Sequence, residues 1–146
     1  MLTIGKLGEA AGVKVPTIRY YEQIGLLPAA ERSAGNQRLY GRDTLNRLRF
    51  IRHSRELGFA LDDIRELLSL SDTPDQPCAA ADVIARRQLA YVNRRISRLN
   101  ALREELTRML DQCSAGTIAN CHVIEVLGNH DLCAHDHDMA GEGPLI

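Results

Sequence analysis

Thiol and imidazole side chains are concentrated in the second half of this chain. The four cysteines are Cys78, Cys113, Cys121 and Cys133, and histidines accompany the last two. Cysteines grouped with histidines indicate metal or redox chemistry rather than disulfides when the compartment is reducing. No apolar run is long enough to cross a bilayer, and the N-terminus lacks the apolar core of a signal peptide. We therefore expect a cytoplasmic protein with a thiol-dependent site and no membrane partner.

Cys113 and Cys121 form the closest pair of thiols along the chain. Seven residues, one of them a glycine, separate them, so a short loop can bring both sulfurs onto one ion. Thiolates are soft ligands that favour Zn²⁺, Cd²⁺, Pb²⁺, Hg²⁺ or Cu⁺ over Mg²⁺ or Ca²⁺. The pair therefore predicts a site for a soft metal ion, and two free thiols without a metal are the alternative.

Five further side chains are candidates for a secondary metal site: His122, His130, Cys133, His135 and His137. His122 either adds a fourth ligand beside Cys121 or is an exposed surface side chain. The other four form either a weak second site or a polar tail that binds metal adventitiously. A site with three thiolate ligands and no other suits the large soft divalent ions, whereas zinc favours a fourth ligand, which His122 could supply.

The longest regular pattern in the chain is a helical one that ends at the cysteine loop. Its apolar positions are Ala85, Leu89, Val92, Ile96, Leu99, Leu102, Leu106 and Met109, followed by Cys113. Their spacing averages about 3.5 residues, which is the heptad repeat of a coiled coil. One narrow apolar stripe on so long a helix predicts an antiparallel homodimeric coiled coil. Packing of the helix against its own N-terminal domain is the alternative.

Cys78 stands at the start of this helix and Cys113 at its end. About 35 helical residues at 1.5 Å each separate the two by roughly 50 Å within one chain. In an antiparallel dimer, however, the start of one helix meets the end of its partner. We therefore expect Cys78 of one subunit to join Cys113 and Cys121 of the other. A free thiol at the helix N-terminus is the alternative for Cys78.

The first 70 residues carry the periodicity of short helices separated by glycine and turn residues. Two short apolar patterns end at Gly12 and Gly25, and such a pair of helices is typical of a helix-turn-helix. The turn sequence Ala34-Gly35-Asn36 then interrupts the helical period and predicts a hairpin. The expected elements are one helix before Gly12, a second before Gly25, a third from Arg42 to Gly58 and a fourth that begins near Ala60 or Leu61, with a β-hairpin wing at 28–41.

Charge is distributed unevenly along the chain, although the net charge is only −1. Residues 1–60 carry ten Lys and Arg against five Asp and Glu, whereas residues 61–146 carry eight against fourteen. A basic first part attached to an acidic remainder indicates a polyanionic partner for the first part alone. Random scatter of the charges is the alternative.

Three stretches carry a family resemblance: TIRYYEQIGLL, RSAGNQRLY and LRFIRHSRELGFALDDIRELL. They resemble the mercury-resistance-regulator (MerR) family of transcription regulators from Ile4 to about Leu70, and the long helix with its cysteine loop extends the resemblance to about Leu127. The resemblance implies a dimer bound between promoter elements that are too far apart. The inducer-bound form then bends and untwists the DNA so that RNA polymerase engages both elements. The family's cuprous sensors have a serine at the position of Cys78, so the resemblance favours a divalent metal.

Eight residues of the first part are candidates for contact with DNA. The arginines are placed for phosphates, the tyrosines can donate a hydroxyl to phosphate while their rings pack, and the start of the second helix is placed for base edges. Tyr21 shares a helix face with Ile18, so a position in the core is its alternative. The candidates are Lys14, Thr17, Arg19, Tyr20, Tyr21, Arg38, Tyr40 and Arg55.

Together these patterns predict a mainly α protein with an N-terminal winged helix-turn-helix, a small β-hairpin wing and a long C-terminal dimerisation helix in an antiparallel coiled coil. We expect a metal-responsive regulator that binds double-stranded promoter DNA as a homodimer, works with RNA polymerase there, and activates metal resistance or efflux genes. The expected segments are a DNA-binding domain at 1–70, a linker at 71–77, a dimerisation helix at 78–113, a metal-binding loop and short helix at 114–127, and a flexible tail at 128–146.

Other functions fit the sequence less well. An iron–sulfur redox sensor needs four closely grouped cysteines, and a drug sensor needs a further ligand-binding domain. A cytosolic metal-buffering protein explains the thiols but not the basic helix-turn-helix, and a Cu⁺ sensor is the alternative within the same family. No nucleophile–base constellation or phosphate-binding glycine loop in the sequence indicates an enzyme.

Overall fold

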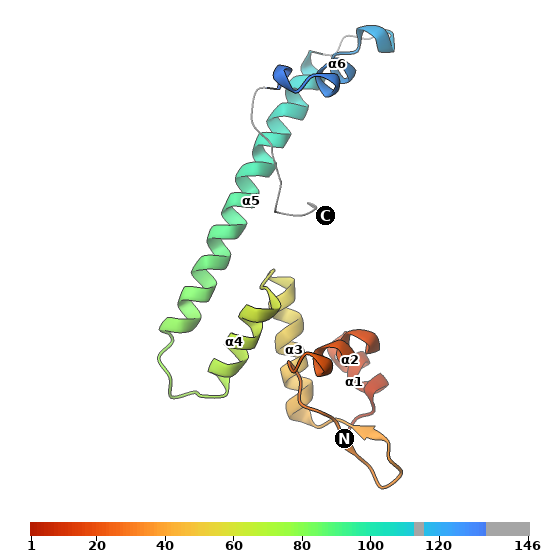
Figure 1. The fold of residues 1–146 in the computed structure, drawn as a ribbon, viewed down its shortest axis with the longest axis vertical. Helices are drawn as coiled ribbons and strands as arrows, with labels where there is room; N and C mark the ends of the chain where they lie inside the picture. Colours follow the sequence, from red (N-terminus) through yellow and green to blue (C-terminus); the bar gives the residue numbers. More distant parts are fainter. Residues whose placement is uncertain (113–115, 134–146) are drawn as a thin grey trace. The chain divides into compact units, whose positions relative to one another are not determined.

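The computed structural model describes residues 1–112 and 116–133, which form helices joined by turns and a small hairpin (Figure 1). The chain divides into two compact units, Met1–Gln88 and the residues from Leu89 onward. The mainly α architecture, the hairpin after the helix-turn-helix and the long helix are those that the sequence predicts. Among the described residues, no helix is both long and apolar enough to cross a membrane.

The helix-turn-helix consists of α1 (Ile4–Ala11) and α2 (Val15–Gln23). Thr3 caps α1 because its hydroxyl accepts a backbone N–H of the first turn at 3.4 Å. The helix ends at Gly12, whose φ of 70° is a left-handed conformation that glycine adopts without strain. Pro16 lies in the first turn of α2, where a helix needs no N–H from it. The tight turn between the two helices therefore follows from these local residue types.

The wing is a two-stranded antiparallel hairpin of β1 (Glu31–Arg32) and β2 (Arg38–Leu39). Its turn includes Asn36 at a φ of 62°, a conformation that asparagine tolerates better than most side chains. The guanidinium of Arg32 donates to the Asn36 carbonyl at 3.1 Å and so braces the turn. The paired residues are Glu31 with Leu39 and Arg32 with Arg38.

Two further helices complete the first unit, α3 (Arg42–Glu56) and α4 (Leu61–Ser71). Figure 1 shows α1, α2 and α3 grouped together, with the hairpin extending from them. Apolar side chains from all four helices and the wing meet in one core, which is why these short elements are stable together. The buried core residues are Leu7, Ala11, Ile18, Tyr21, Leu26, Leu27, Tyr40, Leu48, Ile51, Ile64 and Leu68.

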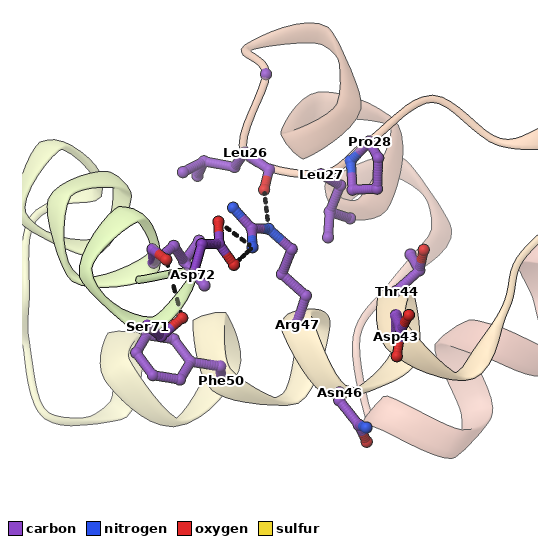
Figure 2. A pocket seen from close by; sticks show the side chains of 12 residues that line it. Leu26, Leu27, Pro28, Asp43, Thr44, Asn46, Arg47, Phe50, Ser71 and Asp72 are labelled. Carbon is purple, nitrogen blue, oxygen red and sulfur yellow. Dashed lines mark hydrogen bonds and ion pairs between the residues drawn. The ribbon is translucent and has the colours of Figure 1, made fainter. Parts of the chain in front are cut away.

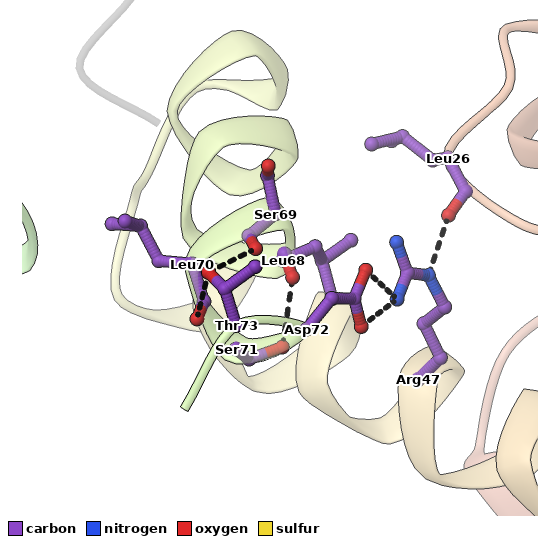
Figure 3. Close-up of polar contacts among 8 residues, drawn as sticks. All are labelled: Leu26, Arg47, Leu68, Ser69, Leu70, Ser71, Asp72 and Thr73. Carbon is purple, nitrogen blue, oxygen red and sulfur yellow. Dashed lines mark hydrogen bonds and ion pairs between the residues drawn. The ribbon is translucent and has the colours of Figure 1, made fainter. Parts of the chain in front are cut away.

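Arg47 ties three segments of this unit together around a surface pocket (Figure 2). Its Nε donates to the carbonyl of Leu26, just beyond α2, at 3.2 Å. Its Nη1 donates to both carboxylate oxygens of Asp72, at 3.1 and 3.2 Å. Figure 3 shows Asp72 at the end of α4, where the Ser71 and Thr73 hydroxyls donate to the last carbonyls of the helix. The start of the linker is thereby fixed to α3.

The long helix α5 covers Ala79–Asp111 without a break and begins directly after Cys78. Most of the apolar positions that the heptad pattern predicts face solvent in the single chain. The exposed fractions are 59% for Leu89, 37% for Val92, 49% for Ile96, 45% for Leu99 and 58% for Leu106. Within the described residues, this row is therefore an apolar surface that the chain itself does not cover. We call these five residues the α5 seam.

The second unit adds three short helices after α5: η1 (Ile118–Asn120), α6 (His122–Gly128) and η2 (His130–Leu132). Met109 of α5 and Val126 of α6 are both buried. The first residues of the predicted flexible tail at 128–146 include η2 and a half-buried Cys133. The guanidinium of Arg108 holds this segment by donating to the Leu132 carbonyl. The remainder of the predicted tail lies outside the described residues.

Candidate nucleic-acid interface and metal centre

The outer face of α2 carries most of the predicted DNA contacts. Lys14, Arg19 and Tyr20 are exposed, and Thr17 is half-buried in the first turn of the helix. Ile18 on the opposite side is completely buried. Packing of that apolar side against the core thus leaves a polar, basic face toward solvent, as a recognition helix requires.

Tyr21 belongs to the apolar side of α2 rather than to this face. It is only 8% exposed and is part of the core with Ile18. Its ring also lies 6.1 Å from the ring of Tyr20, measured between centroids. The Tyr21 ring therefore lies in the core, which is the alternative that the sequence left open. Tyr20, in contrast, is 48% exposed.

Tyr40 differs from the expectation of a hydroxyl directed at phosphate. Its side chain is 1% exposed, and its hydroxyl donates to Glu22 of α2. Burial, together with the hydrogen bond to Glu22 and that residue's charge, raises the pKa of Tyr40 to about 12, against the lowering effect of Arg38. Arg38 itself lies 3.6 Å from the other Glu22 oxygen. Tyr40 therefore fixes the wing to α2, because a buried hydroxyl needs an internal partner.

A shallow hollow of about 380 Å³ lies between the start of α2 and the end of α3. Four of the predicted DNA-contacting residues line it: Lys14, Thr17, Tyr21 and Arg55. The Arg55 guanidinium donates to the carbonyl of Phe59 at 2.7 Å, so its position depends on the corner between α3 and α4. The hollow combines cationic side chains with a helix N-terminus, which suits an anionic group such as a phosphate.

Arg52 also lines this hollow, and the sequence analysis did not rank it. Its Nη1 donates to the Ala11 carbonyl at 3.1 Å, and its Nε lies 3.2 Å from Glu56. A Cβ at Gly12 would lie 2.2 Å from Arg52 Nη1, and the φ of 70° disfavours any side chain there. The spacing Arg49, Arg52, Arg55 on one helix was the available sequence signal, since residues three apart share a face.

Two of the three predicted primary metal ligands, Cys78 and Cys121, lie directly before helices. Cys78 is exposed directly before α5, and Cys121 is half-buried at the N-cap of α6. Cys113 lies outside the described residues. Among the described residues of a single chain, no three His, Cys, Asp or Glu side chains lie together as a metal site. The described part of one chain therefore does not assemble the site alone.

His122 lies next to Cys121 and is less exposed than a surface histidine. Its side chain is 19% exposed, and its Nδ1 lies 3.8 Å from Glu125. Its Nε2 is buried without a hydrogen-bond partner in the described structure. A buried ring nitrogen of this kind is destabilising unless it finds a donor or a metal, so His122 fits the donor set of a soft metal ion.

Cys133, a predicted secondary ligand, is held against α5 instead of facing solvent. Burial raises the pKa of its thiol, and the hydrogen bond and charge of Glu105 raise it further. Glu105 is 4% exposed and accepts from Arg108 at 2.5 Å. Cys133 is thereby linked to Glu105 of α5, and its role as a metal ligand stays a prediction. Of the other predicted ligands, His130 is exposed, while His135 and His137 lie outside the described residues.

Comparison with known proteins matches two related family models to this chain. The model of the MerR HTH family regulatory proteins matches residues 2–71, and the model described as MerR, DNA binding matches residues 45–109. The transcriptional regulator ZntR of Escherichia coli K12 is 39% identical over 130 residues, covering 87% of this chain and 92% of that protein.

Two of the solved structures that are similar to this chain contain a bound metal ion. The transcription regulator PbrR691 from Ralstonia metallidurans CH34, solved with lead(II), is 40% identical with a TM-score of 0.76, over 87% of this chain and 99% of the other. The regulator MerR from Bacillus megaterium MB1, solved with mercury(II), is 30% identical with a TM-score of 0.68 over the same shares. The similarity therefore extends past the helix-turn-helix into the segment that carries the cysteines.

Proposed function

Because the chain belongs to the MerR family of helix-turn-helix regulators, we propose that it is a metal-responsive activator of transcription. It binds double-stranded promoter DNA as a homodimer in the cytoplasm. On binding a soft metal ion it distorts the promoter so that RNA polymerase can engage it, and it thereby activates genes for metal resistance or efflux. Bending and untwisting of DNA cost a few kcal/mol, which is within reach of differences in protein contact between two states.

The DNA half of the proposal is supported by the basic face of the first unit. Lys14, Arg19 and Tyr20 are exposed on α2, and Arg52 and Arg55 reach the same region from α3. Phosphate contacts of this kind position a helix in the groove, while base contacts supply the sequence preference. Arg38 of the wing is about half exposed and adds a further cation.

Homodimerisation is supported by the α5 seam. Five apolar side chains in heptad spacing remain 37–59% exposed in the single chain. A contiguous apolar stripe of this kind in water favours association, and an antiparallel pair of identical helices covers it symmetrically.

The metal half of the proposal combines thiols from two subunits. Cys78 immediately precedes α5, and Cys113 follows the end of that helix at Asp111 by two residues. In the antiparallel dimer, Cys78 of one subunit joins Cys113 and Cys121 of the other. Three thiolates suit Zn²⁺, Cd²⁺, Pb²⁺ or Hg²⁺. The relatives solved with lead(II) and mercury(II) support this class of ion.

His122 is the candidate for a fourth ligand in this site. The support is its buried Nε2, which has no hydrogen-bond partner in the described structure. A tetrahedral ion such as Zn²⁺ would use it, whereas a larger ion would bind the three thiolates alone. The secondary site of His130, Cys133, His135 and His137 is weaker as a proposal, because Cys133 is engaged with Glu105.

The single observation that carries the proposal is Cys78 directly before one unbroken helix, α5, which carries an exposed apolar seam and ends at Asp111, two residues before Cys113 in the sequence. The test is promoter transcription with purified polymerase, titrated separately with Zn²⁺, Cd²⁺, Pb²⁺, Hg²⁺ and Cu⁺. We expect a response to divalent ions that is lost in Cys113→Ser and in Cys121→Ser. Unchanged metal-dependent transcription in both variants would reject the site.

A Cu⁺ sensor is the alternative within the family, and Cys78 distinguishes the two. Cys78→Ser should weaken the response to divalent ions far more than any response to Cu⁺. Equal loss for both classes would remove Cys78 from the divalent site. Metal binding without any change in transcription would instead indicate a metal-buffering protein.

A further inference from the structure

The first turns of α5 are attached by polar contacts to α4 and to the corner between α3 and α4. The guanidinium of Arg87 donates to the Asp63 carboxylate of α4 at 2.7 Å. One residue later, the side-chain amide of Gln88 donates to the Leu57 carbonyl at 3.1 Å. Ile84, on the same helix face, is 2% exposed. We call the pairs Arg87–Asp63 and Gln88–Leu57 the α5 clasp.

The corner between α3 and α4 is shaped around this clasp. Gly58 has a φ of 84°, and a Cβ there would lie 2.8 Å from Gln88 Nε2. A side chain at this position would therefore both strain the backbone and displace the amide. On its other side, the corner supplies the Phe59 carbonyl that fixes Arg55 at 2.7 Å. Three consecutive residues thus link α5 to a side chain of the predicted DNA-binding face.

We propose that the α5 clasp transmits metal occupancy at Cys78 to the DNA-binding face, through residues 57–59 and Arg55. This inference rests on the proposed function. Cys78 directly precedes α5 and belongs to the same compact unit as the clasp. A metal that draws Cys78 toward its other ligands changes the position of the first turns of α5. Because both clasp contacts are directional hydrogen bonds, at 2.7 and 3.1 Å, the corner follows that change and carries Arg55 with it.

In this proposal the α5 clasp couples metal binding to DNA binding and does not merely stabilise the fold. The chain provides a matched control that separates these two roles. Arg86 is the neighbour of Arg87 on α5, and its Nε donates to Asp82 within the same helix at 2.7 Å. Arg86→Ala removes the same charge and an ion pair of the same length, 2.7 Å, but this ion pair lies within α5 and does not reach α4. Asp63 lies in the first turn of α4, where a carboxylate also stabilises the helix end. Substitutions of Arg87 and Gln88 are therefore cleaner than substitution of Asp63.

The test measures three quantities for each variant: metal affinity, operator affinity without metal, and the ratio of transcription with and without metal. For the double variant Arg87→Ala/Gln88→Ala we expect unchanged metal affinity, retained operator binding, and a transcription ratio lowered about fivefold, the factor that corresponds to about 1 kcal/mol of coupling. Arg86→Ala should keep the wild-type ratio. A wild-type ratio in the double variant, or an equal fall in Arg86→Ala, would overturn the proposal.

A charge reversal covers the case in which the double variant does not fold. Arg87→Glu places a carboxylate opposite Asp63 and should lower the ratio, and Arg87→Glu combined with Asp63→Arg should restore part of it. If the combined charge reversal restored none of the metal-dependent transcription, the proposed role of the α5 clasp would be overturned. If the wild-type chain itself shows no metal response, the proposed function fails first, which separates the two ideas.

Discussion

Replacement of Tyr40 by phenylalanine separates an internal role of its hydroxyl from a role in DNA binding. The ring is 1% exposed, so phenylalanine fills the same space, and the change removes only the hydroxyl that donates to Glu22. A hydrogen bond to a charged group contributes about 1.5–3 kcal/mol. Glu22 keeps Arg38 at 3.6 Å, and Arg38 is about half exposed, so we expect a loss near the lower end, about 1.5 kcal/mol.

The effect also has a defined dependence on pH. The pKa of Tyr40 is about 12 in the folded chain, against 10.0 for the free side chain. Because the unfolded state releases this proton first, the contribution of Tyr40 is fully present below about pH 10 and is lost as the pH rises toward 12. The increase of the Tyr40 pKa from 10.0 to about 12 corresponds to a loss of roughly 2–3 kcal/mol of stability at high pH. Tyr40→Phe should therefore lack this alkaline loss of stability.

The assay is denaturant unfolding at fixed protein concentration, at about pH 8 and about pH 11, since a dimer's stability depends on its concentration. Operator affinity is measured on the same preparations. Tyr20→Phe is the control because Tyr20 is 48% exposed, and it should leave stability unchanged. Unchanged stability of Tyr40→Phe together with a large loss of operator affinity would refute the internal role and return the hydroxyl to the phosphate contacts.

Three further predictions concern the first unit, the α5 seam and the exposed face of α2. Arg47→Ala leaves the Leu26 carbonyl and Asp72 without this partner and should lower the free energy of unfolding by about 1–3 kcal/mol; denaturation with no measurable change would contradict it. Leu99→Asp places a charge in the α5 seam, where the side chain is 45% exposed in the single chain. Sedimentation should then show a shift from dimer to monomer. An unaltered dimer would exclude the α5 seam as the interface. Arg19→Ala should weaken operator binding and reduce the slope of log affinity against log salt by about 2 per dimer, from one phosphate contact per subunit; an identical slope would remove Arg19 from the phosphate contacts.

The helix ends were predictable from sequence because local residue types determine them. Gly12, Gly25 and Gly58 end or follow helices, and all three have φ values of 70–84°. The heptad positions were predictable for the same reason, since Leu89, Val92, Ile96, Leu99 and Leu106 are exposed as one row. The wing was predicted from its turn residues, and it forms around Asn36.

Interactions between distant segments could not be predicted in the same way. The Tyr40 hydroxyl bonds to Glu22, 18 residues earlier, and nothing in the local sequence identifies that partner. Ile84 is buried although the predicted apolar stripe of the long helix begins at Ala85, because heptad spacing does not indicate whether a position beside the stripe is buried. Cys133 had the composition of a metal-binding tail, but its environment depends on Glu105 and on the packing of η2 against α5.

The most direct test of the account is a mixed dimer of two inactive chains, one carrying Cys78→Ser and the other Cys121→Ser. If each site takes Cys78 from one subunit and Cys113 with Cys121 from the other, the mixed dimer contains one complete site, whereas either parent dimer contains none. We predict that the mixed dimer binds about half the metal of the wild type and recovers metal-dependent transcription. A mixed dimer that binds no more metal than its parents would contradict the shared site.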